Sequence, residues 1–233
     1  MSFLFEQLPL AIQLRDDATF ENFYSGRHAL LLNQLKQQLA GGERYIYLFG
    51  PDGCGRSHLL QAACHAATAL GLSSCFLPLT ELRDYAPQDL FEGLEQLSLV
   101  CLDDIQAVIG EPVWEEQLFH LFNRLLDHKV ALLVAADRSV RELNPALADL
   151  SSRLNWGVVY QLQQADDEER LKVFCFRASQ RGIAIEDEVA RFIYHRCQRD
   201  MNALLEVLDK LDLASIKQQR RVTIPFVKAT LAW

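Results

Sequence analysis

The stretch GPDGCGRSHLL, residues 50–60, constrains the fold most, because it follows the glycine-loop pattern G-x-x-x-x-G-K-[ST] with one change. Arg56 stands at the position of the lysine, and Ser57 supplies the hydroxyl. Apolar residues precede the loop and a helical pattern follows it, so the segment predicts a strand, a turn and a helix. Backbone N–H groups at such a turn attract phosphate oxygens. The residues expected to bind a nucleotide here are Gly50, Gly53, Cys54, Gly55, Arg56, Ser57 and His58.

Apolar runs alternate with helical patterns along most of the chain, which favours an α/β domain built on a parallel sheet. Strands are expected at 43–50, 75–79, 97–104, 130–137 and 158–162, with an amphipathic helix over 114–128. After the acidic stretch QQADDEE the patterns are helical to the end of the chain. We therefore expect three parts: a segment over 1–15, an α/β nucleotide-binding domain over 16–165 and a small helical domain over 166–233.

Charge and composition exclude several classes of protein. Residues 1–165 carry 11 Lys and Arg against 20 Asp and Glu, a net of −9, and residues 166–233 carry 12 against 11, a net of +1. A protein that grips DNA usually shows a basic face, so we expect DNA contact only through partners. The sequence has no basic signal region, no apolar run of membrane length and no CxxC pair. These features predict a cytoplasmic protein with no membrane contact.

The apolar run LSLVCLDD ends in two carboxylates, about 46 residues after Ser57. Asp103 and Ser57 would hold Mg²⁺, as the corresponding residues of P-loop ATPases do. Asp104 stands where many ATPases place a glutamate that orients the attacking water, and it is one methylene shorter. Taken alone, the two carboxylates also fit a strand that ends at solvent. The planar guanidinium of Arg56 is larger and more rigid than the compact ammonium of the usual lysine. We therefore expect nucleotide binding with weak hydrolysis.

Six segments occur in the order seen in the AAA+ module of the DnaA replication initiator family, which the chain resembles over nearly all its length. They are TFENFYSG, GPDGCGRSHLLQA, CLDDIQ, AADR, SSRLNWG and RDMNALL. The chain is similar in particular to the short DnaA homologues that promote inactivation of the initiator. The resemblance implies an AAA+ P-loop domain with a parallel sheet, followed by a small helical lid domain.

The resemblance also implies roles for residues outside the loop. Phe23 and Tyr24 would border the adenine pocket, and Asp137 falls at the sensor I position. Arg199 matches sensor II, which reaches the phosphates from the lid. Arg153 matches the arginine finger, the catalytic residue that enters a neighbouring subunit's nucleotide site. Without the resemblance, each arginine is equally an ordinary surface residue.

Departures from the initiator pattern bear on function. The initiator has lysine and threonine where this chain has Arg56 and Ser57, and a basic residue where Asp149 stands. The helix-turn-helix DNA-binding domain that follows the initiator's lid is not expected here. Around the finger, we expect Leu154 and Trp156 to pack inward and hold the arginine at the domain edge.

The N-terminal stretch EQLPLAIQL is similar to the clamp-binding motif of the short homologues and of other sliding-clamp ligands. In such a motif an extended peptide places a glutamine at the rim and apolar side chains in pockets. Pro9 favours the extended backbone. The expected clamp-binding residues are Gln7, Leu8, Leu10 and Ile12. A segment packed on its own domain is the alternative.

Together these features imply a negative regulator of replication initiation. It would bind the DNA polymerase sliding clamp and stimulate hydrolysis of ATP on the DnaA initiator through an arginine finger in trans. Its own cofactors would be an adenine nucleotide, with ADP expected, and Mg²⁺. A self-contained AAA+ ATPase such as a helicase loader is the alternative, and a DNA-binding initiator paralogue is a third. The sequence leaves homo-oligomer formation open.

Overall fold

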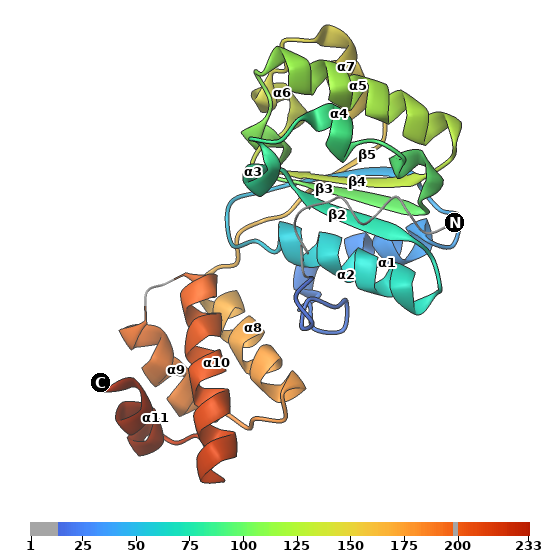
Figure 1. Ribbon diagram of the computed structural model, residues 1–233. Helices are drawn as coiled ribbons and strands as arrows, with labels where there is room; N and C mark the ends of the chain where they lie inside the picture. The colour runs from blue at the N-terminus through green and yellow to red at the C-terminus, as the bar shows by residue number, and fades with distance from the viewer. Residues whose placement is uncertain (1–13, 198–199) are drawn as a thin grey trace. The chain divides into compact units, whose positions relative to one another are not determined.

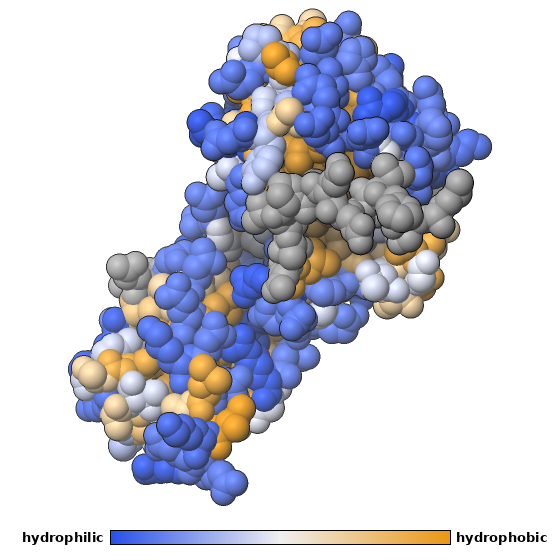
Figure 2. All heavy atoms as spheres, in the orientation of Figure 1, coloured by the Kyte–Doolittle hydropathy of each residue, from blue (hydrophilic) through white to orange (hydrophobic). Residues whose placement is uncertain are grey.

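The computed structural model describes residues 14–197 and 200–233 (Figure 1). The chain divides into two compact units, the first ending at Gln163 and the second running from Gln164 to Trp233. Among the described residues, no helix combines the length and the apolar character that a membrane span needs. Figure 2 shows a face of the molecule that is mostly polar, with apolar residues scattered over it.

A five-stranded sheet in the order β2-β3-β4-β1-β5 forms the centre of the first unit. Every pairing between neighbouring strands is parallel. This arrangement confirms the predicted α/β class with a parallel sheet. The strands are β1 (Tyr45–Phe49), β2 (Ser74–Pro78), β3 (Leu99–Asp103), β4 (Ala131–Ala136) and β5 (Val158–Gln161).

Helices cover both faces of this sheet: α1 and α2 lie on one face, and α4, α5 and α7 on the other (Figure 1). The α-helices of the unit are α1 (Ala29–Gln38), α2 (Arg56–Ala69), α3 (Leu79–Leu82), α4 (Pro87–Leu90), α5 (Pro112–Asp127), α6 (Val140–Leu143) and α7 (Ala148–Leu154). Short 3₁₀ helices are η1 (Gly26–His28), η2 (Leu94–Gln96) and η3 (Ile105–Ala107).

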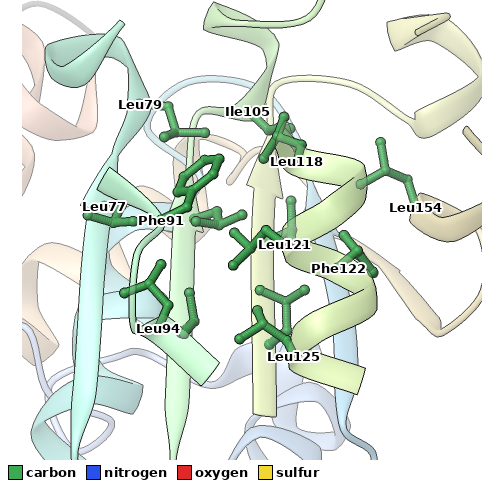
Figure 3. Close-up of a cluster of buried hydrophobic side chains, with 14 of the residues drawn as sticks. Leu77, Leu79, Phe91, Leu94, Ile105, Leu118, Leu121, Phe122, Leu125 and Leu154 are labelled. Atoms are coloured by element: carbon green, nitrogen blue, oxygen red, sulfur yellow. The ribbon is translucent and has the colours of Figure 1, made fainter. Parts of the chain in front are cut away.

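Side chains that alternate along each central strand supply two cores. From β1, Tyr45 and Tyr47 belong to the cluster beneath α5, while Ile46 and Leu48 belong to the cluster beneath α2. Strands buried on both faces read as continuous apolar runs, which is why the sequence shows no polar alternation there. Figure 3 shows the α5 side, where four helix residues at i, i+3, i+4 and i+7 point at the sheet: Leu118, Leu121, Phe122 and Leu125.

The parallel strand order brings the carboxyl ends of β1, β3 and β4 to one edge. Phe49 pairs with Ala136, and the N–H of Gly50 donates to the Ala136 carbonyl oxygen at 3.2 Å. The glycine loop therefore leaves β1 beside the end of β4, and β3 ends at Asp103 on the other side of β4. Ligands of open parallel sheets bind at this edge.

The second unit is helical, with α8 (Asp167–Gln180), α9 (Asp187–Arg196), α10 (Met201–Gln218) and α11 (Ile224–Leu231). The Asp166 carboxylate caps α8 by accepting the N–H of Glu169 at 2.8 Å, as the acidic stretch predicts. Pro225 stands in the first turn of α11. A separate core forms around Phe174, Leu208 and Phe226.

The expectation that Trp156 packs inward is wrong, because its side chain is 58% exposed. Leu154 is buried as expected, but α7 ends there and Asn155 follows as its C-cap. A Cβ atom on Gly157 would lie 2.3 Å from the Tyr45 carbonyl oxygen and 2.4 Å from its ring. Since Tyr45 fills the inner space next to Gly157, the tryptophan ring points away from the core.

The close approach at Gly157 generates a prediction about stability. Gly157→Ala should lower the free energy of unfolding by about 2–3 kcal/mol, because the new methyl group meets rigid β1 backbone. Equilibrium urea unfolding measures the loss. Asn155→Ala, at an exposed neighbour with one local hydrogen bond, should cost less than about 1 kcal/mol. Equal stabilities of the two variants would contradict this packing of β5 on β1.

Candidate nucleotide-binding site

The glycine loop, residues 50–55, connects β1 to α2 and leaves the first turn of α2 open. Gly53 and Gly55 have φ values of 75° and 99°, which L side chains rarely adopt. Gly55 is the N-cap of α2 and provides no side-chain cap. The N–H groups of the first helical turn can therefore donate to phosphate oxygens.

Phe23 packs against the loop, because a Cβ atom on Gly55 would lie 2.7 Å from its ring. The centroids of the Phe23 and His58 rings are 5.6 Å apart, and His58 Nε2 lies 2.8 Å from the Thr19 carbonyl oxygen. The structure thus brings Phe23 next to two other predicted cofactor residues, Gly55 and His58, although both follow it far along the chain. Tyr24, next in the chain, is half-buried.

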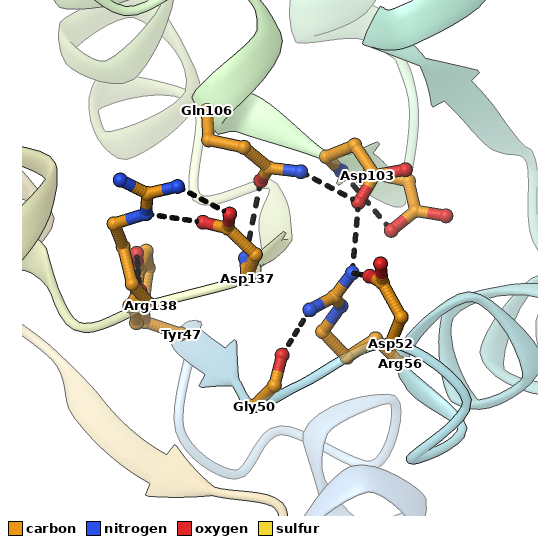
Figure 4. A network of polar contacts seen from close by, with 9 residues as sticks. Tyr47, Gly50, Asp52, Arg56, Asp103, Gln106, Asp137 and Arg138 are labelled. Atoms are coloured by element: carbon orange, nitrogen blue, oxygen red, sulfur yellow. Dashed lines mark hydrogen bonds and ion pairs between the residues drawn. The ribbon is translucent and has the colours of Figure 1, made fainter.

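Arg56 is 7% exposed and binds protein groups (Figure 4). Its Nη1 donates to the Gly50 carbonyl oxygen. Its Nη2 donates to Oδ1 of Asp52 and to Oδ1 of Asp104, each at 3.1 Å. Asp104 adopts a left-handed backbone conformation, with φ 54°, at the point where the chain leaves β3. The arginine that the loop pattern assigns to phosphate is therefore shared between two carboxylates, one of which is the predicted water-positioning residue.

Asp103 lies at the end of β3 and is only 3% exposed. Burial, with the charge of Asp104, raises the pKa of the Asp103 carboxyl to about 6, and a hydrogen bond with Ser57 partly offsets this rise. The two predicted metal ligands are thus neighbours. A hydroxyl and a carboxylate are hard oxygen donors, so the pair fits Mg²⁺, which would supply positive charge next to bound phosphates.

Gln106 connects the ends of β3 and β4, a contact that no sequence motif predicts. Its Nε2 donates to Asp104 Oδ1 at 2.9 Å, and its Oε1 accepts the N–H of Asp137 at 3.2 Å. The Asp137 carboxylate pairs with Arg138 through two contacts of 2.7 and 2.6 Å, which lower the pKa of that carboxyl. Asp137 therefore stands at the same edge as the loop, with its charge turned to Arg138 (Figure 4).

Arg153 is not part of this cluster. It lies in the last turn of α7, shortly before Val158, which pairs with Ile46 near the start of β1. The glycine loop follows the other end of β1, so Arg153 lies toward the opposite edge of the sheet. It is half-buried, and its side chain has no hydrogen bond or ion pair within residues 14–197 and 200–233.

Five predicted site residues lie outside the described residues and stay predictions. They are the clamp-binding residues Gln7, Leu8, Leu10 and Ile12, and the sensor II residue Arg199.

The parallel sheet, the glycine loop that opens α2 and the carboxylates at the ends of β3 and β4 define a P-loop domain of the AAA+ class, followed by a helical lid. Residues 14–161 match the family model described as the bacterial DnaA ATPase domain, and residues 167–231 match that of the Hda lid domain. The chain belongs to the bacterial DnaA ATPase family, with a lid of the Hda type. It is thus a DnaA-related replication regulator.

Solved structures of known proteins share this fold. Domain III of the Thermotoga maritima replication initiation protein DnaA is 22% identical, with 94% of this chain and 98% of that chain covered and a TM-score of 0.76. AMPPCP-bound DnaA from Aquifex aeolicus is also 22% identical, with 88% and 68% covered and a TM-score of 0.72. The RuvB Holliday junction branch migration motor of Thermotoga maritima is 19% identical, with 88% and 67% covered and a TM-score of 0.63.

The bridge made by Gln106 can be tested through stability. Gln106→Ala removes the hydrogen bonds to Asp104 and from the Asp137 amide, so the free energy of unfolding should fall by about 1–2 kcal/mol. Amide hydrogen exchange at Asp137 should become faster. Gln96→Ala is the matched control, since Gln96 is exposed in η2 and should change stability by less than about 0.5 kcal/mol. A loss no larger than that of the control would contradict the bridge.

Proposed function

We propose that this protein promotes hydrolysis of ATP bound to the DnaA initiator by supplying Arg153 in trans. The observation that carries the proposal is the contrast between two arginines. Arg56 is buried and shared between carboxylates, whereas the Arg153 guanidinium has no partner among the described residues. An arginine at the edge opposite its own glycine loop suits a neighbouring molecule's nucleotide better than its own.

The chemistry needed from Arg153 is electrostatic. A guanidinium is planar and always charged, and it can donate two parallel hydrogen bonds to a phosphoryl group. Where charge moves onto the leaving phosphate in the transition state, such a finger accelerates hydrolysis by about 10³–10⁵-fold. Under this proposal the hydrolysed nucleotide belongs to the initiator, and this chain acts as its activator.

The chain's own site, in this proposal, holds ADP with Mg²⁺ and does little chemistry. The open first turn of α2 provides donors for phosphates, and Ser57 with Asp103 provides the metal ligands. Asp52 and Asp104 already pair with the Arg56 guanidinium. Their negative charges offset its positive charge, so it attracts the γ-phosphate of ATP less strongly. The same contacts occupy the Asp104 carboxylate, so this carboxylate is less available to orient a water molecule.

This assignment predicts nucleotide preference. Calorimetry in the presence of Mg²⁺ should show tighter binding of ADP than of ATP, with turnover by the protein alone far below the ordinary enzyme rate of about 10 s⁻¹. Asp104→Asn should raise the affinity for ATP relative to ADP several-fold, because it frees Arg56 from one carboxylate. Asp84→Asn, at an exposed position, is the matched control. Ordinary turnover by the native chain would instead support a self-contained ATPase.

The proposal also includes the sliding clamp as a partner, through Gln7, Leu8, Leu10 and Ile12. The support is the sequence pattern, a glutamine and spaced apolar residues that suit an extended peptide in apolar pockets. Binding to a clamp on DNA would bring the acidic first 165 residues to DNA without a basic surface of their own. DNA contact would then run through partners.

The central test compares Arg153→Ala with the native protein. Incubation of ATP-bound DnaA with DNA-loaded clamp and either protein should leave hydrolysis at least about 10²-fold slower with the variant. Folding, nucleotide binding and clamp binding should be unchanged, since the Arg153 side chain has no partner among the described residues. Arg141→Ala, an exposed arginine on α6, is the matched control. Native-like stimulation by Arg153→Ala would show that Arg153 is not the finger.

A second arm of the same assay separates docking from chemistry. A variant with Gln7, Leu8 and Leu10 all changed to alanine should lose clamp capture in a pull-down and lose stimulation at low protein concentration. Its melting temperature should stay nearly unchanged if the segment serves the clamp. A fall of many degrees would show that the segment is part of the folded domain.

A further inference from the structure

Glu115 is a buried carboxylate that none of the motifs includes. It lies in the first turns of α5 and is only 1% exposed. Its oxygens accept three backbone N–H groups, from Gly110 at 2.8 Å, Ala146 at 3.1 Å and Leu147 at 2.7 Å. In the part of the chain that the structure describes, Glu115 forms no ion pair with a basic side chain. Main-chain donors alone therefore compensate this buried charge.

Two of these donors belong to the segment that leads into α7. Leu147 is the N-cap of α7, and its apolar side chain provides no cap. The Glu115 carboxylate satisfies the N–H groups of Ala146 and Leu147 instead, and it places negative charge at the N-terminal end of the helix, where the peptide dipoles favour it. Glu115 thus ties the start of α7 to α5.

The other end of α7 is held by a second buried group. Tyr45 Oη donates to the carbonyl oxygen of Leu154, the last residue of the helix, at 2.9 Å. Tyr45 is buried beneath α5, and burial raises the pKa of its hydroxyl, so it stays a donor. Leu150 and Leu154 pack into the same core. The short helix that carries Arg153 is therefore fixed at both ends by polar groups from α5 and β1.

We propose that Glu115 is a positioning residue for Arg153, and this inference rests on the proposed function of Arg153 as a finger in trans. A finger has to reach a phosphate on another molecule, and a displacement of about 1 Å at a catalytic group can lower a rate by about 100-fold. A helix of seven residues can shift when a partner binds unless its ends are fixed to the rest of the domain. Glu115 provides that attachment at the N-terminal end, and Tyr45 provides it at the C-terminal end.

Two substitutions of Glu115 test the inference in a graded way. Glu115→Ala removes all three acceptor contacts, whereas Glu115→Gln keeps one acceptor oxygen and should rescue part of the loss. Glu116→Ala and Glu116→Gln are the matched controls, because Glu116 is the next residue on α5 and is exposed.

The readouts are the maximal rate of DnaA-bound ATP hydrolysis, the protein concentration at half-maximal stimulation, and amide hydrogen exchange at Leu147. We expect Glu115→Ala to lower the maximal rate at least about tenfold, with a smaller loss for Glu115→Gln. The half-maximal concentration and ADP binding should stay within about threefold of native, because Glu115 belongs neither to the glycine loop nor to the predicted clamp motif. Exchange at Leu147 should accelerate in the same order.

Tyr45→Phe, which removes only the hydroxyl, should also lower the maximal rate, and it provides the test if Glu115→Ala does not fold.

The results distinguish the inference from the proposal beneath it. Native-like maximal rates for Glu115→Ala and Tyr45→Phe, together with failure of Arg153→Ala, would overturn the positioning role and leave the finger in place. An equal loss for the Glu116 controls would also overturn it. Full stimulation by Arg153→Ala would remove the proposed function, and the positioning role with it.

Discussion

The burial of parallel strands on both faces is the constraint on which the other features depend. Because β1, β3 and β4 run in the same direction, each must return across a face of the sheet before the next begins. The glycine loop, Asp103 and Asp137 consequently gather at one edge. The segment that returns from β4 to β5 ends at the opposite edge and carries Arg153 there. The gathering of the candidate nucleotide-binding residues at one edge and the position of Arg153 at the other both follow from this topology.

Two buried charges in this domain are stabilised in different ways. Arg56 is paired with carboxylates of Asp52 and Asp104, so removing either partner alters the charge balance next to the loop. Glu115 has main-chain donors as partners, and these have fixed positions and no charge to lose. The first arrangement can respond to a ligand that competes for the arginine. The second can only hold a segment in place.

The sequence predicted the parts of the fold that depend on local pattern. Strands and α5 were predictable because apolar periodicity follows from burial, and the loop because its glycine spacing serves a backbone turn. The contacts of Glu115 were not predictable, since its donors Ala146 and Leu147 follow 31 and 32 residues later in the chain. The exposure of Trp156 is unpredictable for a related reason, because only the packing of Gly157 on Tyr45 shows that the inner space is filled. Contacts between distant segments leave no periodic signal.

The separate core of the lid has a thermodynamic consequence. Phe174, Leu208 and Phe226 pack with other residues of the second unit, while the sheet contributes to clusters of its own. A unit that buries its own apolar side chains can lose its structure as one cooperative step without the other. Heating would then unfold the two units in separate transitions rather than in a single all-or-none step. A single melting temperature would describe neither unit. A substitution in the core of the lid would then lower the melting temperature of the lid and leave the melting enthalpy of the sheet domain unchanged.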